Sequence, residues 1–176
     1  YRECYEAVNR RFAAQLQSLL HEDDLIWIHD YHLIPLAKYL RALGVDNRIG
    51  FFLHIPFPDV AMLAHIEGID ALLSDLLSYD LIGLQTVADV TSLHNACMRL
   101  PGVDARSGRF LISGSRHTQI DAFPIGIDVN HIQELLMQRN IRRRVKTIRN
   151  RLSGGKLIVG VDRLDYSKGI PERLRG

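Results

Sequence analysis

Several features that would assign a function outright are missing from this sequence of 176 residues. Cysteine occurs only at Cys4 and Cys97, without the spacing of a metal or redox motif. No apolar run exceeds about six residues, which is far too short to span a membrane. The 22 basic and 20 acidic residues leave a formal charge of +2, so no global field favours nucleic acid or a membrane surface. Two free thiols favour a reducing compartment, and we expect a cytoplasmic protein.

Motifs of several enzyme classes are also absent. The sequence has no GxSxG nucleophile turn, no GxGxxG dinucleotide fingerprint and no P-loop ending in Gly-Lys-Ser or Gly-Lys-Thr. It has no HExxH pair or cysteine cluster that would hold zinc. A nucleophilic enzyme or a dedicated metal site is therefore poorly supported.

Short apolar runs alternate with helical patterns along the chain, which is 47% hydrophobic and 24% charged. The runs predict buried strands at residues 25–28, 48–54, 80–84, 118–123 and 156–161. The periodic segments predict helices at 1–19, 33–43, 60–78 (broken near Gly68), 86–100 and 130–151, with a loop or hairpin at 101–116. The first of these helices is predicted to bury an apolar stripe formed by Tyr1, Tyr5, Val8, Phe12, Leu16 and Leu19. Strands that are apolar throughout and alternate with helices favour an α/β fold, with a parallel sheet covered by helices on both faces.

In such folds, ligands bind beyond the carboxyl ends of the strands. The loop after the last predicted strand carries Arg163 and Lys168, and Gly169 allows a tight turn before a helix. An arginine can hold two phosphate oxygens and a lysine adds a point charge, so this loop suits a phosphate group. Surface ion pairs with Asp162, Asp165 and Glu172 explain the same residues equally well.

Asp30 lies in a cluster of four polar side chains, residues 29–32 (His-Asp-Tyr-His), that follows the first predicted strand. A metal site is one interpretation of the cluster, although neighbours in one turn point in different directions. A sugar or polyol pocket, in which Asp30 accepts hydrogen bonds from hydroxyl groups, fits better. A third interpretation is structural, with the Asp30 carboxylate capping the next helix.

His54 ends the second predicted strand, before a rigid turn containing two prolines. A lone histidine of this kind is often structural, but its place at the expected ligand edge makes a functional role equally plausible. Ile55 beside it would supply an apolar wall. The basic run at residues 142–151 has no interleaved aromatic residues, so we interpret it as a solvated helix face and not as a nucleic-acid site.

Five longer motifs occur at the predicted strand ends. They are WIHDYHL at residues 27–33, RIGFFLHIPFP at 48–58, YDLIGLQT at 79–86, PIGID at 124–128 and RLDYSKG at 163–169. Together they resemble the trehalose-6-phosphate synthases, in that family's order and with similar spacing. These enzymes are retaining glycosyltransferases with two Rossmann-like domains, the GT-B type. The resemblance covers nearly the whole sequence and is weakest at residues 101–117.

The resemblance implies transfer of glucose from UDP-glucose to glucose 6-phosphate with retention, giving trehalose 6-phosphate and UDP. It implies that Asp30 holds the acceptor, that His54 lies near the donor glucose and the reacting centre, and that Ile55 helps to select the acceptor's α-anomer. It also implies that Arg163 and Lys168 bind the diphosphate of UDP-glucose. The family uses no metal or other cofactor. The expected partners are these small molecules and, in a homo-oligomer, further copies of the protein, with no nucleic acid and no membrane.

The resemblance also implies a domain organisation. Residues 1–152 would form the C-terminal portion of the acceptor-side Rossmann-like domain, and residues 153–155 a linker. Residues 156–176 would be the first strand, loop and helix start of the nucleotide-sugar domain. Because a GT-B cleft needs both domains, we expect this stretch to be an internal fragment that is inactive alone.

Two other functions remain open at this point. One is a related glucosyltransferase with another phosphorylated acceptor, such as glucosylglycerol-phosphate synthase, which takes glycerol 3-phosphate. The other is a non-catalytic, synthase-like regulatory subunit, against which the presence of Asp30, His54 and both loop cations argues. A nucleic-acid-binding module is a distant third.

Overall fold

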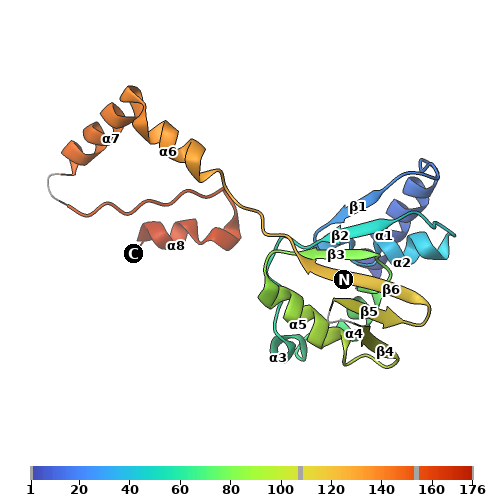
Figure 1. The fold of residues 1–176 in the computed structure, drawn as a ribbon. Coiled ribbons are helices and arrows are strands. Elements are labelled where there is room, and N and C mark those ends of the chain that lie inside the picture. Colours follow the sequence, from blue (N-terminus) through green and yellow to red (C-terminus); the bar gives the residue numbers. More distant parts are fainter. Residues whose placement is uncertain (1, 107–108, 153–154, 176) are drawn as a thin grey trace. The chain divides into compact units, whose positions relative to one another are not determined.

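Two units make up the computed structural model, which describes residues 2–106, 109–152 and 155–175. The first unit covers Tyr1–Ile125 and the second covers Gly126–Gly176. The first unit contains a six-stranded sheet in the order β1-β2-β3-β6-β5-β4, shown in Figure 1. Within the described ranges, no helix is both long enough and apolar enough to cross a bilayer.

Helices and strands alternate through the first unit as the sequence predicts. Its strands are β1 (Ile26–His29), β2 (Ile49–Phe52), β3 (Leu81–Leu84), β4 (Val103–Arg106), β5 (Phe110–Ser113) and β6 (Arg116–Ala122). Its helices are α1 (Arg2–Gln17), α2 (Leu36–Ala42), α3 (Val60–Leu63), α4 (Ile69–Leu76) and α5 (Val87–Cys97), and a 3-10 turn, η1 (Tyr31–Leu33), follows β1. The predicted break near Gly68 is confirmed, because this residue has a φ of +75° between α3 and α4.

Strands β1, β2, β3 and β6 are parallel, which confirms the α/β fold class. The segment predicted as a loop or hairpin is a hairpin, because β4 and β5 run antiparallel and β5 also pairs antiparallel with β6. Residues 107 and 108, between β4 and β5, lie outside the described residues.

The helices of the first unit pack on one face of the sheet. They share a single hydrophobic core with inward-facing strand residues such as Ile28, Phe51 and Ile82. The connections β1 to β2, β2 to β3 and β3 to β6 all move across the sheet in the same direction. Because such crossovers are right-handed, they place their helices on the same side. Helices were expected on both faces, but among the described residues the opposite face stays open, and Trp27 on β1 is 70% exposed.

Helix α1 buries a different face from the one that the sequence predicts. The apolar stripe was expected to include Val8 and Phe12, yet these side chains are 48% and 53% exposed. The structure buries Asn9 and Ala13 instead. Ala13 is small enough to let α1 approach α2. Asn9 Nδ2 donates two hydrogen bonds in its buried position, whereas Asn9 Oδ1 has no hydrogen-bond partner among the described residues. Tyr1, the first residue of the predicted stripe, lies outside the described residues.

Two basic residues of α2 connect it to its neighbours, Lys38 to two other helices and Arg41 to the residue before β3. Lys38 Nζ lies 2.9 Å from Asp75 Oδ2 on α4 and 3.5 Å from Glu6 Oε2 on α1. Burial raises the pKa of the Asp75 carboxyl group, although the hydrogen bond from Lys38 opposes this rise. Arg41 donates from Nη2 to Asp80 Oδ2 at 2.8 Å, directly before β3.

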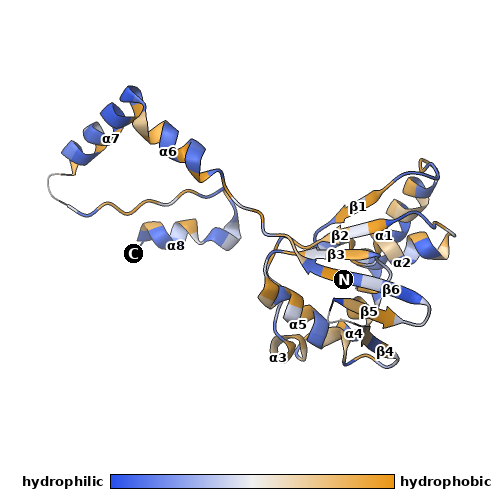
Figure 2. Ribbon diagram, in the orientation of Figure 1, coloured by the Kyte–Doolittle hydropathy of each residue, from blue (hydrophilic) through white to orange (hydrophobic). Residues whose placement is uncertain are grey.

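The second unit contains α6 (Val129–Met137), α7 (Arg139–Arg151), a 3-10 turn η2 (Tyr166–Lys168) and α8 (Ile170–Arg175). The single long helix expected at 130–151 is therefore wrong: Gln138, with a ψ of 134°, separates two helices. The sequence has no proline or glycine at this break, and nothing in the structure explains it. Hydrophilic residues dominate α7 in Figure 2, and no described residue of this helix is buried, as expected for the basic run.

The strand expected at residues 156–161 is also absent from the structure. This segment is extended but exposed, with Ile158 at 94% and Val161 at 89% exposure. A β-strand needs a hydrogen-bonded neighbour, and no described residue of the second unit forms one. Of the linker expected at 153–155, residues 153 and 154 lie outside the described residues.

We expect the Cys97 thiol to resist alkylation in the folded full-length protein. Cys97 lies fully buried in α5, and this burial raises its pKa to about 12, so little reactive thiolate forms at neutral pH. Mass spectrometry of a Cys4→Ser variant treated with iodoacetamide should find Cys97 modified only after denaturant is added. Rapid labelling of Cys97 in native buffer would contradict the packing of α5.

Candidate functional site

Parallel strands bring polar residues together at the carboxyl edge of the sheet. Asp30 directly follows β1, His54 lies two residues beyond β2, and Gln85 follows β3. The Gln85 side chain accepts a hydrogen bond from the backbone N–H of Ile125 at 3.0 Å, which ties the chain after β6 to the same edge. The sequence therefore located this edge correctly.

Asp30 has an unusual backbone conformation, with φ at 69° and ψ at 162°. Side chains other than glycine rarely adopt this region, and holding one there costs about 1–3 kcal/mol. The Asp30 N–H donates to the Phe52 carbonyl at 2.8 Å, and Oδ1 accepts from the His54 N–H at 3.3 Å. The carboxylate makes no capping bond to η1, so the structural interpretation of Asp30 as a helix cap is wrong. Strain of this kind is typical of functional sites.

His54 contacts a second histidine, His29, which ends β1 and is the first residue of the polar cluster. The two rings approach to 3.0 Å between His29 Nδ1 and His54 Nε2. One ring must therefore donate an N–H and the other must accept it. His29 also lies against Trp27, and His54 against Phe52, so the four rings form a row. His29 lies within the polar cluster at residues 29–32, but its contact with His54 depends on the register of β1 and β2.

The segment after His54 is held by the start of α5. The Phe57 N–H donates to Asp89 Oδ1 at 3.0 Å. The other carboxylate oxygen, Asp89 Oδ2, accepts from the backbone N–H of Thr86, and the Thr86 hydroxyl accepts from the Asp89 N–H, which together form a capping box. Asp89 thus connects the helix to the turn that begins at Ile55, whose side chain is 47% exposed.

A groove of about 760 Å³ lies on the open face of the sheet in the first unit. The row of rings from Trp27 to Phe52 lines it, together with Gly83 on β3 and Phe123 beyond β6. Gly83 makes room for both phenylalanine rings, because a Cβ at this position would lie 2.7 Å from Phe52 Cδ2 and 3.1 Å from Phe123 Cδ2. The groove is mostly apolar and has His29 and His54 at one end.

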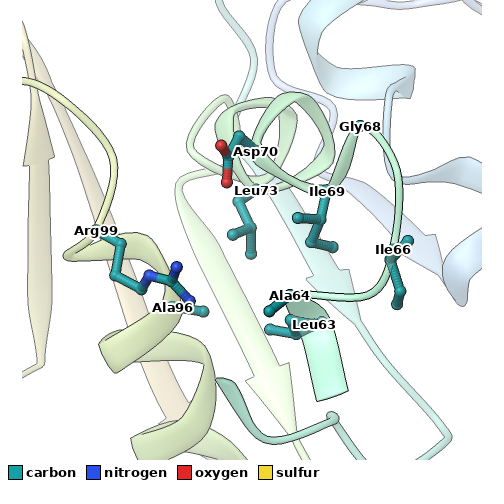
Figure 3. Close-up of a pocket in the computed structure, with 9 residues that line it drawn as sticks. All are labelled: Leu63, Ala64, Ile66, Gly68, Ile69, Asp70, Leu73, Ala96 and Arg99. Carbon is teal, nitrogen blue, oxygen red and sulfur yellow. The ribbon is translucent and has the colours of Figure 1, made fainter. Parts of the chain in front are cut away.

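A smaller pocket of about 290 Å³ lies among α3, α4 and α5 and is drawn in Figure 3. Asp70 and Arg99 are the charged residues that line it. It includes none of the site residues that the sequence predicts.

The two predicted cations, Arg163 and Lys168, belong to the second unit. Arg163 Nε lies 3.6 Å from Asp165 Oδ2, one of the ion pairs expected from the structural interpretation, but the Arg163 side chain is 82% exposed. Asp165 accepts two hydrogen bonds from Ser167, which lower its pKa, and it caps η2. In the described part of the chain, Lys168 Nζ has no carboxylate oxygen within 4.0 Å. Gly169, at a φ of 58°, ends η2 before α8, as the sequence predicts for a tight turn.

Among the described residues, no group of three or more histidine, cysteine or acidic side chains is arranged to hold a metal ion. The metal interpretation of the cluster at residues 29–32 therefore finds no support in the geometry. The candidate residues that the structure brings together are Asp30, His29 and His54, with Ile55 next to His54 in the sequence.

Comparison with known proteins identifies the family to which this chain belongs. Residues 2–176 match the profile of glycosyltransferase family 20. A trehalose-6-phosphate synthase of Salmonella choleraesuis is 41% identical over 172 residues, which is 98% of this chain but 36% of that protein. The chain thus spans about a third of the length of the curated relatives that it matches.

Solved structures show the same relationship. An α,α-trehalose-phosphate synthase (UDP-forming) from Burkholderia vietnamiensis is 45% identical, with a TM-score of 0.82 over 97% of this chain and 39% of that chain. An E. coli structure bound with UDP-2-fluoro glucose is 40% identical, with a TM-score of 0.81 over 97% and 38%. A Burkholderia xenovorans synthase in complex with glucose 6-phosphate is 42% identical, with a TM-score of 0.79 over 98% and 39%.

We expect a Gly83→Ala substitution in the full-length protein to lower the free energy of unfolding by about 1–3 kcal/mol, as overpacking generally does. The new methyl group would displace the rings of Phe52 and Phe123. Gly50→Ala on the same face is the matched control, because its Cβ would meet Trp27 Cδ1 at an ordinary 3.8 Å. Urea unfolding of both variants measures the difference, and equal stability would show that the rings have space to move.

Proposed function

Because this chain belongs to glycosyltransferase family 20, we propose that the protein containing it transfers glucose from UDP-glucose to glucose 6-phosphate, with retention of configuration. The products are trehalose 6-phosphate and UDP. The observation that carries the proposal is the match over residues 2–176 to a family whose curated and solved relatives are named as trehalose-6-phosphate synthases. One such relative was solved with glucose 6-phosphate, and an E. coli structure was solved with a UDP-glucose analogue.

The acceptor side of the proposed site is built on Asp30. Its carboxylate lies at the carboxyl edge of the sheet, where it can accept hydrogen bonds from sugar hydroxyl groups. His54 follows β2 and is proposed to lie near the donor glucose and the reacting centre. The exposed Ile55 side chain would form the wall that selects the α-anomer.

The donor side is assigned to Arg163 and Lys168. As the glycosyl bond breaks, negative charge grows on the departing UDP. Two cations on the diphosphate then stabilise the transition state more than the ground state, and only such differential binding accelerates the chemical step. The exposure of Arg163 leaves its guanidinium accessible to an anion.

Three further expectations belong to the same proposal. Residues 156–176 would begin the nucleotide-sugar domain, and residues 1–152 would end the acceptor-side domain. The protein would be cytoplasmic, in keeping with the two free cysteines. It would need no metal, because the two cations would neutralise the leaving group.

Replacing either cation by alanine in the full-length protein should lower kcat by about 10²–10³, the usual loss when one donor to a developing negative charge is removed. UDP release in the presence of glucose 6-phosphate measures the rate. Arg175→Ala, on α8 and outside the loop that carries both cations, is the matched control and should leave the rate unchanged. Normal turnover by the Arg163→Ala and Lys168→Ala variants would refute the diphosphate assignment.

Activity of the full-length protein should survive dialysis against EDTA, since the proposed chemistry uses protein cations alone. Loss of turnover in EDTA and its recovery with Mg²⁺ would show that a metal takes part.

The UDP-release assay, run with glycerol 3-phosphate in place of glucose 6-phosphate, distinguishes the proposed acceptor from that of a glucosylglycerol-phosphate synthase.

A further inference from the structure

Three side chains bind the turn that follows the proposed acceptor carboxylate. The Tyr5 hydroxyl donates to the first carbonyl of η1, that of Tyr31. Asn9 Nδ2 donates to the second carbonyl at 3.1 Å, and the Tyr79 hydroxyl donates to the third at 2.8 Å. Every carbonyl of η1 therefore has a side-chain donor from a distant part of the sequence.

These donors come from α1 and from the segment between α4 and β3. Tyr5 and Asn9 lie on α1, 26 and 23 residues before their acceptors, and Tyr79 lies 46 residues after its acceptor. Asn9 and Tyr79 are 0% and 1% exposed, so neither can touch a substrate. Asn9 Nδ2 also donates to the Tyr5 carbonyl at 3.0 Å, and the Tyr79 ring packs on Phe51 of β2 at a centroid distance of 5.0 Å. Each donor is therefore itself held in place.

The turn fixes the residue before it. The Leu33 N–H donates to the Asp30 carbonyl at 3.2 Å, so the position of η1 determines where Asp30 can lie. Asp30 has a φ of 69°, which a non-glycine residue keeps only when its surroundings impose it. If η1 shifted, Asp30 could return to an ordinary conformation, and its carboxylate would leave the His54 N–H.

We propose that Tyr5, Asn9 and Tyr79 are positioning residues that hold the Asp30 carboxylate in place for acceptor binding. This inference rests on the proposed function, because it assumes that Asp30 binds glucose 6-phosphate. The three side chains act through the backbone of η1 and not on the substrate. If their role were purely structural, substitutions of these residues would lower the stability of the protein without a selective effect on the KM for glucose 6-phosphate.

The test compares phenylalanine variants of the full-length protein, because each removes one hydroxyl and keeps the ring. Tyr79→Phe should raise the KM for glucose 6-phosphate roughly tenfold, since it leaves a partly buried carbonyl without a donor. Tyr5→Phe should have a smaller effect, because water can reach the exposed bond that it replaces. The KM for UDP-glucose should stay unchanged in both variants.

Tyr39→Phe is the matched control. The Tyr39 hydroxyl also joins α2 to α1, but it donates to Glu6 and not to η1. We expect its thermal unfolding to resemble that of the Tyr5→Phe variant and its KM for glucose 6-phosphate to equal that of the parent protein.

A double variant tests the coupling directly. When Asp30 is already replaced by alanine, Tyr79→Phe should cause no further rise in the KM for glucose 6-phosphate, because the effects of substitutions at coupled residues do not add.

Two results would overturn the inference, and they are distinguishable. If Asp30→Ala raises the acceptor KM while Tyr5→Phe and Tyr79→Phe behave like Tyr39→Phe, the positioning role is wrong and the proposed function stands. If Asp30→Ala leaves the acceptor KM unchanged, both the Asp30 assignment and the inference fail. Should Tyr79→Phe not fold, Tyr5→Phe at the molecular surface decides between these results.

Discussion

The handedness of the strand crossovers determines the organisation of the first unit. Each parallel strand is added on the same side of the one before it, so right-handed connections bring the helices to a single face. The hydrophobic core forms on that face, and the other face keeps its aromatic and histidine side chains open to a groove. The separation between the face of the sheet that carries the hydrophobic core and the face that lines the groove thus follows from the topology of the described strands.

The geometry of the candidate site follows from the same sheet. The hydrogen bond from Asp30 to the Phe52 carbonyl extends the β1–β2 pairing by one residue beyond the strands. This extra pairing places the Asp30 carboxylate beside the His54 N–H, although 24 residues separate the two in sequence. Where the ladder ends, the backbone departs from extended geometry, and side chains from α1 and from the segment before β3 hold the turn that follows.

Much of this could be predicted from the sequence. Short apolar runs gave the parallel strands, and the shared edge of such strands was enough to group Asp30 with His54. The sequence could not show that α1 would bury Asn9 in place of Phe12, because that choice depends on a carbonyl 23 residues away. Nor could it show the His29–His54 contact, which requires the strand register. The segment at 156–161 has the composition of a strand, but composition cannot supply the neighbour that a strand requires.

The chemical nature of the donors around η1 determines how their hydrogen bonds respond to pH. Burial raises the pKa of Tyr5 to about 12 and also raises the pKa of Tyr79 above its usual value. Both phenols therefore remain protonated, and remain donors, at and well above neutral pH, whereas a histidine in either place could lose its proton. The hydroxyl donors beneath Asp30 do not titrate in that range. A change in acceptor binding near neutral pH would therefore come from groups other than these two phenols.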